Sequence, residues 1–366
     1  MPSKQIAPRS INALYLTADN DRWAGLLYGI MRSLRTFSSG MKAFLSRYPV
    51  MVLAILTLGF QFTIVIVAGT MIPEGKRLHD APSAHMLFRF RVFWPLIFAV
   101  GLTAYLEGKD GLKKLFGSYL VWRVPKRWYA FAFTWKFLFV FLAWAVADIA
   151  GVLPWPGGII NMFAGNAEHF WKLVATMPFI LGIALVEETT WMKYCVTRLQ
   201  DKYNAFTSAF ITGVLWGLWY LPMLLLHEGV PDGVPWYMFL LSMGALAVLL
   251  GWVFNMTHSG LILLVMQVIS NICFFMTPAL PVVHDGDPSY VMAFIWVEVI
   301  IATLIVLRYG VKDLGVGPRP TWSNSHADVV PVTGPELVSS QVTARSMELA
   351  NAKELSDAVV PELIRK

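Results

Sequence analysis

The stretch "FILGIALVEETTWMKYCVTRLQ", residues 179–200, sets two adjacent acids, Glu187 and Glu188, directly after a run of apolar residues. Burying a carboxylate in an apolar segment is costly, so an ionisable residue at membrane depth is a candidate functional residue. The plain alternative is that the two acids end the apolar segment and lie in water. The residues around them must decide between these interpretations.

The composition of the chain is that of a membrane protein that crosses the bilayer several times. Of its 366 residues, 57% are hydrophobic and 14% are charged, and the mean hydropathy is +0.58. Soluble domains carry roughly 25% charged residues, so a soluble enzyme is excluded. We predict an all-α polytopic bundle of about eight transmembrane helices, each near the ~20 apolar residues that a bilayer requires. The predicted spans are residues 50–72, 92–106, 128–152, 171–192, 205–226, 236–256, 259–276 and 289–308.

The polar ends of the chain complete the predicted domain organisation. Residues 1–48 are predicted to be a basic amphipathic leader on the inner surface, and residues 313–366 a polar, largely disordered cytoplasmic tail. The transmembrane domain would occupy residues 49–312. With both termini inside, most of the 29 Lys and Arg residues fall on the inner side, as the positive-inside rule requires. We therefore expect an integral protein of the plasma (inner) membrane of a bacterium, with both termini cytoplasmic and no cleaved signal peptide.

The net charge of +6 requires no nucleic acid as partner. It reflects the positive-inside bias together with attraction to anionic membrane lipids, which are the partners expected from composition. Lys136 and Glu298 lie inside predicted spans and are expected to pair between helices.

Four polar residues of three different spans are predicted to lie at similar depth. With a helical rise of 1.5 Å per residue, Glu187 lies roughly 17 Å from the basic inner end of its span, and Tyr220 about 24 Å along the next one. By the same reckoning Gln267 and Asn271 lie about 15 and 21 Å into the seventh span, and their spacing of four residues places them on one helix face. This estimate assumes that the helix continues past the acids to Arg198, and it favours a polar site near the middle of the membrane.

The segment from Glu187 to Asn271 resembles the CPBP intramembrane endopeptidases, the family of the CAAX prenyl endopeptidases and the bacterial Abi proteins. The resemblance rests on "EETTWMKYCVTRLQ", on "GVLWGLWYLP" at 213–222, and on "WVFNMTHSGLILLVMQVISN" at 252–271, and it covers residues 187–273. The family carries the motifs EExxxR, FxxxH and a late HxxxN or HxxxD. It implies a multi-helix membrane fold and a peptide-bond hydrolase that acts on membrane-associated or prenylated peptides.

The resemblance also shows where this chain departs from its family. Glu187, Glu188 and Asn271 keep the family residue. The motif arginine falls on Met192, the FxxxH phenylalanine and histidine fall on Trp216 and Tyr220, and the last histidine falls on Gln267. The candidate catalytic residues are therefore Glu187, Glu188, Tyr220, Gln267 and Asn271.

The replacements affect the mechanism that the resemblance implies. In the family, a glutamate activates water while histidines and an asparagine orient it and stabilise the oxyanion. Tyr220, Gln267 and Asn271 can donate hydrogen bonds, but none exchanges a proton near pH 7 as imidazole does. Loss of one such group typically costs 10²–10⁴ in rate.

Three functions follow from these residues. The first is an impaired member or pseudoprotease that binds a membrane-embedded or lipidated peptide or a protein partner. The second is an active glutamic-type endopeptidase with altered helper residues, and the third is a transporter-like protein with a polar centre. We expect no cofactor and no metal, because zinc requires three or four close ligands and His227, Glu228 and His258 are predicted to lie at the ends of spans, away from Glu187.

Overall fold

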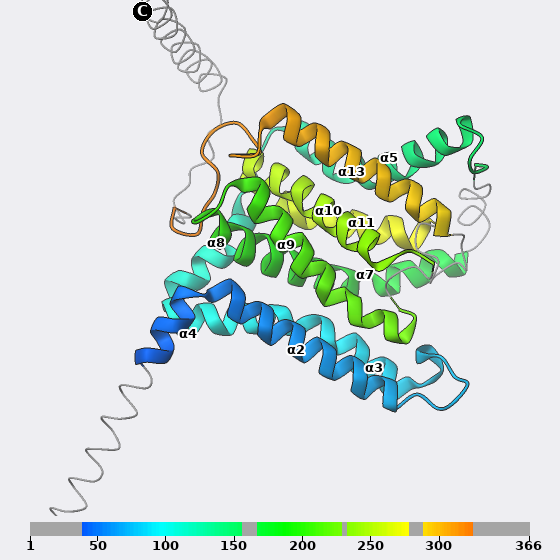
Figure 1. Ribbon diagram of the computed structural model, residues 1–366, viewed down its shortest axis with the longest axis horizontal. Helices are drawn as coiled ribbons and strands as arrows, with labels where there is room; N and C mark the ends of the chain where they lie inside the picture. The colour runs from blue at the N-terminus through cyan, green and yellow to red at the C-terminus, as the bar shows by residue number, and fades with distance from the viewer. Residues whose placement is uncertain (1–38, 156–166, 229–232, 278–287, 325–366) are drawn as a thin grey trace, which may run out of the picture. The chain divides into compact units, whose positions relative to one another are not determined.

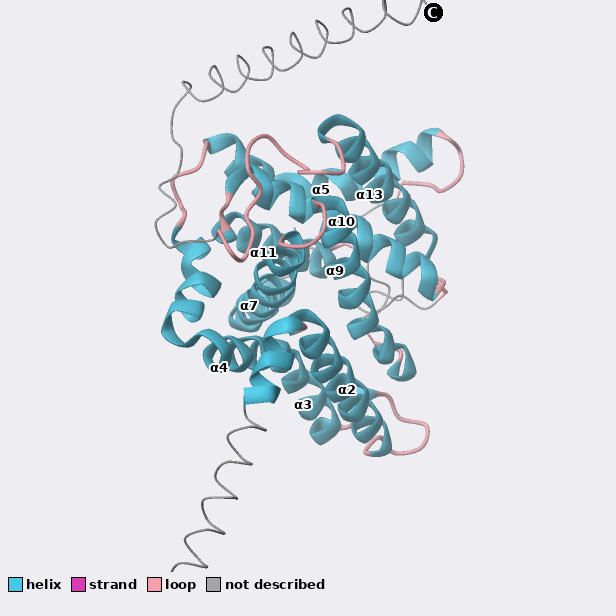
Figure 2. Ribbon diagram, turned by 60° about the vertical axis from the view of Figure 1, so that its left-hand side comes forward, coloured by secondary structure: helices cyan, strands magenta, loops and turns pink. Residues whose placement is uncertain are grey.

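The computed structural model describes residues 39–155, 167–228, 233–277 and 288–324. These residues form helices and connecting loops, without a β-strand among them (Figure 2). Within the described residues, seven helices are long and apolar enough to cross a membrane, and a shorter apolar helix covers Gly260–Phe274. The predicted polytopic helical bundle is therefore confirmed.

The helices follow the predicted spans closely, except at the second. They are α2 (Pro49–Thr70), η1 (Leu78–Asp80), α3 (Pro82–Phe90), η2 (Arg91–Phe93), α4 (Trp94–Gly117), η3 (Ser118–Leu120), α5 (Lys126–Ile149), α7 (Ala167–Glu187), η4 (Glu188–Val196), α8 (Thr197–Gln200), α9 (Ala205–Tyr220), η5 (Leu221–Leu226), α10 (Trp236–Thr257), α11 (Gly260–Met276) and α13 (Pro288–Tyr309).

The second span was predicted too short. Instead of residues 92–106, one apolar helical stretch runs over Pro82–Leu120. The apolar run in the sequence is interrupted by Arg89 and Arg91, but the helical backbone continues through them. Helix α3 begins upstream of both arginines, with a proline at its first positions. Arg91, which directly precedes the predicted span, is buried.

Helix α10 lies at the centre of the bundle, packed against α9 and α13 (Figure 1). In an apolar 18-residue segment of α10, 72% is buried within the protein, the largest share among the described helices that are long enough to span a membrane. Close approach to α9 depends on Gly213, where an added Cβ would lie 2.3 Å from the Met243 carbonyl oxygen. Small residues allow such contacts between membrane helices. Helix α11 in turn packs against α5 and α7, which brings it next to the end of α7.

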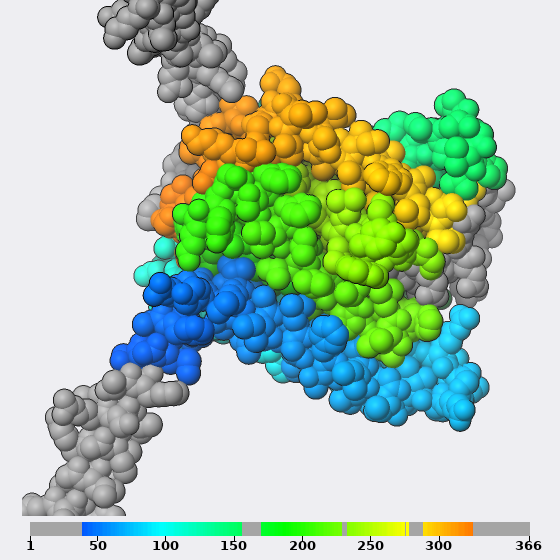
Figure 3. Space-filling view, viewed as in Figure 1, coloured from blue at the N-terminus to red at the C-terminus, as the bar shows by residue number. Residues whose placement is uncertain are grey.

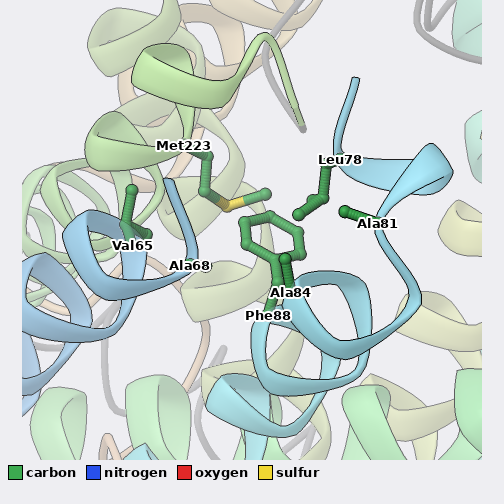
Figure 4. Close-up of a cluster of buried hydrophobic side chains, with 7 residues drawn as sticks. All are labelled: Val65, Ala68, Leu78, Ala81, Ala84, Phe88 and Met223. Carbon is green, nitrogen blue, oxygen red and sulfur yellow. The ribbon is translucent and has the colours of Figure 1, made fainter. Parts of the chain in front are cut away.

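One buried apolar cluster joins α2, η1 and α3 to η5 (Figure 4). Its members are Val65, Ala68, Leu78, Ala81, Ala84, Phe88 and Met223. Phe88 and Met223 also line the cavity described below, so this cluster fixes one wall of that cavity.

The first described residues of the predicted tail pack onto the helices. Trp322 donates from its indole N–H to both oxygens of Glu107, at 2.8 and 2.9 Å, and Gln200 donates to the Pro320 carbonyl at 2.9 Å. In Figure 3 this segment, coloured orange, lies against the green surface of the neighbouring helices. Residues 325–366 lie outside the described residues, so the tail as a domain stays a prediction.

The chain divides into two compact units, Met1–Val52 and Leu53–Lys366. In the first unit, residues 39–47 are helical and α2 begins at Pro49. Residues 1–38 lie outside the described residues, so the amphipathic leader stays a prediction as well.

Candidate functional site

The two acids lie where one helix changes its geometry. Glu187 is the last residue of α7, and Glu188 is the first of η4, which is a π-helix over Glu188–Val196. The helix was predicted to continue to Arg198, and it does continue, but not as a regular α-helix. Every residue of the π-helical segment is buried. A π-helix is rare, and it is frequently found at functional sites.

Glu187 is the centre of the site and is fully buried. The Tyr220 hydroxyl donates a hydrogen bond to one carboxylate oxygen, Oε1. The Gln267 side-chain amide donates to the other, Oε2, at 2.5 Å. The three residues come from the end of α7, the end of α9 and the middle of α11. The structure therefore brings together three of the residues that were predicted to lie at similar depth.

Asn271 lies one helical turn beyond Gln267 and does not bond to the acids. Its side-chain N–H donates instead to the Gln267 backbone carbonyl at 3.0 Å. It lines the cavity next to the site. Asn271 can therefore reach a ligand in the cavity, while Gln267 holds Glu187.

Glu188 faces a different environment from Glu187. It is 1% exposed, and neither of its carboxylate oxygens has a hydrogen-bond partner among the described residues. Glu188 interacts electrostatically with Glu187 and Tyr119, and the Tyr119 hydroxyl is paired at 2.7 Å with that of Thr189. The acid pair thus consists of one carboxyl with two donors and one without any among the residues described.

The residues after the acids do not supply the cation of the family motif. Met192 is fully buried and packs toward Gly251 of α10. The Lys193 ammonium lies 5.6 Å from the centre of the Phe254 ring. The described residues contain no ion pair between Lys193 and Glu188.

A cavity of about 250 Å³ is lined by Tyr220, the hydrogen-bond partner of Glu187, and by a buried arginine. The lining residues are His85, Phe88, Arg89, Arg91, Val92, Phe179, Ile183, Trp219, Tyr220, Met223 and Asn271. Arg91 is 6% exposed and interacts electrostatically with Glu187 and Glu228. Arg91 was missed from the sequence because the predicted second span begins only at residue 92. An arginine inside a long apolar helix is the signal that could have found it.

No group of three or more His, Cys, Asp or Glu side chains that could hold a metal ion occurs in the part of the chain that the structure describes. His227 ends η5 in the left-handed conformation, and His258 does the same after α10, so both lie at helix ends as predicted. Burial raises the pKa of Glu228 and lowers the pKa of His258. The charge of Arg91 acts on Glu228 in the opposite sense, lowering its pKa.

Comparison with known families identifies the central part of the chain. Residues 169–273 match the model of the type II CAAX prenyl endopeptidase Rce1-like family. The chain carries an Rce1-like domain. The resemblance seen in the motifs is thereby confirmed, and the matched residues include Glu187, Tyr220, Gln267 and Asn271. No curated protein matches the sequence at a significant level.

The Rce1-like match extends from α7 to α11, and the apolar helices around it are long enough to cross a membrane. Arg91 lies outside the matched residues, on the helical stretch before the domain. The site is thus composed of family positions in the Rce1-like domain and a cation from elsewhere in the chain.

Proposed function

We propose that this Rce1-like protein binds a membrane-embedded or lipid-modified peptide at the Glu187 site and hydrolyses it poorly. The observation that carries the proposal is that both carboxylate oxygens of Glu187 accept hydrogen bonds from neighbouring side chains, those of Tyr220 and Gln267. A carboxylate held in this way has little freedom to bind and deprotonate water.

The chemistry of the two donors supports the same conclusion. A general base must take a proton in the transition state and pass it on, and it works best when its partners can exchange protons near the working pH. A phenol and a carboxamide do not do so near pH 7. Two histidine positions of the family are therefore occupied by groups that hold the acid but cannot relay its proton.

The active-enzyme hypothesis is the second candidate, and Glu188 favours it. Its carboxylate is buried and lacks a hydrogen-bond partner among the described residues, so it is the acid with oxygens left for water. Asn271 could then donate a hydrogen bond to the oxyanion from the cavity wall. On this mechanism Glu188, rather than Glu187, would be the base.

We place the protein in the plasma (inner) membrane of a bacterium with both termini cytoplasmic. The distribution of Lys and Arg between the loops supports this orientation. Lipids surround the apolar helices, and the peptide or protein partner would enter the site from the bilayer.

A cleavage assay in liposomes tests the proposal. It compares the wild type, Glu187→Ala, Glu188→Ala and the double variant Tyr220→His, Gln267→His on prenylated peptides. We expect wild-type turnover close to the detection limit of the assay and at least tenfold faster turnover by the double variant, because two proton-exchanging groups are restored. Tyr237→His is a control, since Tyr237 is exposed and lies outside the cavity lining.

The other outcomes separate the candidates. Wild-type cleavage that is lost in Glu188→Ala would establish the active enzyme and overturn the proposal. Binding of the same peptides is measured in parallel by photocrosslinking. A protein that neither cleaves nor crosslinks any of them would refute peptide binding.

A further inference from the structure

We propose that Lys193, together with Lys114 and Arg198, binds the phosphate headgroup of an anionic phospholipid at the end of the π-helix. We call these three residues the basic cluster. Composition predicts a general attraction of anionic lipids to the basic side of the protein, whereas the basic cluster would hold one lipid at a defined place. The cluster shares no residue with the described lining of the cavity that contains Arg91, so lipid binding here does not depend on peptide binding near Glu187.

Lys193 is a buried cation without a bonded anion. It is 6% exposed and belongs to the π-helical segment that begins with Glu188. Its ammonium lies 5.6 Å from the centre of the Phe254 ring, and it makes no ion pair or hydrogen bond with a described residue. Because a buried charge is costly unless it is paired, an anionic ligand would supply the missing partner.

The neighbours of Lys193 add positive charge to the site. Helix α4 packs against η4, and Lys114 of α4 interacts electrostatically with Lys193. Lys114 lies 3.8 Å from Glu107, the same acid that Arg198 of α8 contacts at 2.7 Å. In the described part of the chain these three cations thus have one acid within ion-pair distance, and it pairs with only two of them. A phosphate group would balance the excess charge and accept hydrogen bonds from several donors at once.

The loop next to the cluster indicates that the phosphate belongs to a lipid. Trp122, in the loop that follows α4, is 59% exposed, and exposed tryptophans of membrane proteins lie at the level of the lipid headgroups. The Ser259 hydroxyl donates to the Val121 carbonyl at 2.6 Å, which holds this loop next to His258. His258 in turn interacts electrostatically with Lys193. The acyl chains of a lipid bound at the cluster can therefore lie along this loop.

The proposed lipid would contact the segment that carries the acids. Lys193 follows Glu188 by five residues, which is one turn of a π-helix, because its hydrogen bonds join residues i and i+5. A headgroup on Lys193 would therefore hold the end of this segment without occupying the cavity.

Native mass spectrometry of the full chain in detergent micelles tests the inference. The probes are dioleoyl phosphatidylglycerol, which is anionic, and dioleoyl phosphatidylcholine, which has the same acyl chains and a neutral headgroup. We expect phosphatidylglycerol to bind about tenfold more tightly, because its charge balances the basic cluster. Lys193→Met should remove most of this preference. The variant breaks no described ion pair, and its unchanged affinity for phosphatidylcholine would report an intact fold.

Lys113→Met is the matched control, because it removes the same charge from the neighbouring position. The Lys113 side chain is 70% exposed and lies 3.5 Å from Asp110, so this variant should keep the preference for phosphatidylglycerol. An equal loss in both variants would show diffuse attraction and overturn the defined site.

Two further results would also overturn the inference. Equal affinity of the wild type for the two lipids would do so without the need for any variant. Inorganic phosphate that displaces phosphatidylglycerol at equal concentration would assign the basic cluster to free phosphate instead of a lipid.

Discussion

Two buried carboxylates in this protein have opposite surroundings. Glu298 of α13 accepts a hydrogen bond from the Ser242 hydroxyl at 2.5 Å and lies 3.8 Å from the Lys136 ammonium. Glu187 accepts from the Tyr220 hydroxyl and the Gln267 amide. Both acids are at most 1% exposed, but within the part of the chain that the structure describes only Glu298 of the two has a cation within ion-pair distance.

The two acids also differ in whether their surroundings are closed or border a cavity. The Lys136 ammonium lies 4.2 and 4.1 Å from the ring centres of Phe274 and Phe294, so its site is closed by aromatic side chains. Tyr220, the partner of Glu187, lines a cavity with Arg91. A closed, charge-balanced pair holds helices together, whereas an acid held by neutral donors next to a cavity with a buried arginine is suited to a ligand. Four variants sharpen or break this comparison.

Lys136→Met should have the largest effect on stability. It leaves the Glu298 charge buried without its cation, which typically costs 3–5 kcal/mol. We expect the free energy of unfolding in mixed micelles to fall by about that amount. Lys126→Met, at the exposed start of the same helix, is the matched control.

A second measurement identifies the cause. The double variant Lys136→Met, Glu298→Leu removes both charges and should recover most of the loss. If the single variant costs less than about 1 kcal/mol, the pair does not hold α5 to α13 and the comparison fails.

Tyr220→Phe should cost less, although it also removes one partner of a buried carboxylate. The lost donor is neutral, and Gln267 still bonds to the acid. We expect a loss of about 1–3 kcal/mol in the free energy of unfolding. Tyr237→Phe, an exposed site on α10, is the control. A cost equal to that of Lys136→Met would show that Glu187 is as much a structural anchor as Glu298, and the assignment of the two sites would have to be reversed.

Much of this comparison was accessible from the sequence. The apolar runs predicted the bundle, and the ionisable residues inside them predicted both polar centres, including the Lys136–Glu298 pair that the structure confirms. Helical rise alone placed Tyr220 and Gln267 at similar depth to Glu187. These inferences succeed because the constant rise per residue of an α-helix fixes how deep each residue lies in a span that crosses the bilayer.

Three features were not accessible, each for a different reason. The π-helix of Glu188–Val196 depends on which backbone carbonyl each N–H selects, and its residues have no composition of their own. Arg91 interrupts the apolar run in the sequence, although it lies inside the longer helical stretch Pro82–Leu120. Residues 310–324 are polar and without periodicity, yet hydrogen bonds to single side chains such as that of Asn255 hold them in place. Contacts of this kind join residues far apart in the sequence, so no local pattern reports them.

Glu107→Gln should have a smaller effect than either buried change. This acid accepts hydrogen bonds from Arg198 at 2.7 Å and from the Trp322 indole, but its side chain is 27% exposed. Since water screens a partly exposed pair, we expect a loss of about 1 kcal/mol or less. Hydrogen exchange of residues 310–324 measures the local release directly. Asp110→Asn, an exposed acid on the same helix, is the control. A loss above about 3 kcal/mol would mean that charge balance rather than burial sets the order of the three acids.

His258→Asn should have the smallest effect, and it appears only in the pH dependence. Burial lowers the pKa of His258 in the folded protein below its ordinary value of 6.5, so the unfolded chain binds more protons at mildly acidic pH. Stability should therefore fall as the pH drops through about 6.5. Asn tolerates the left-handed backbone that this position requires, with φ at 54°, and should flatten the slope in this range without changing stability near pH 8. If the slope is unchanged in the variant, the acid sensitivity belongs to another group, and the titration of the two buried carboxylates must be examined before their sites are called different.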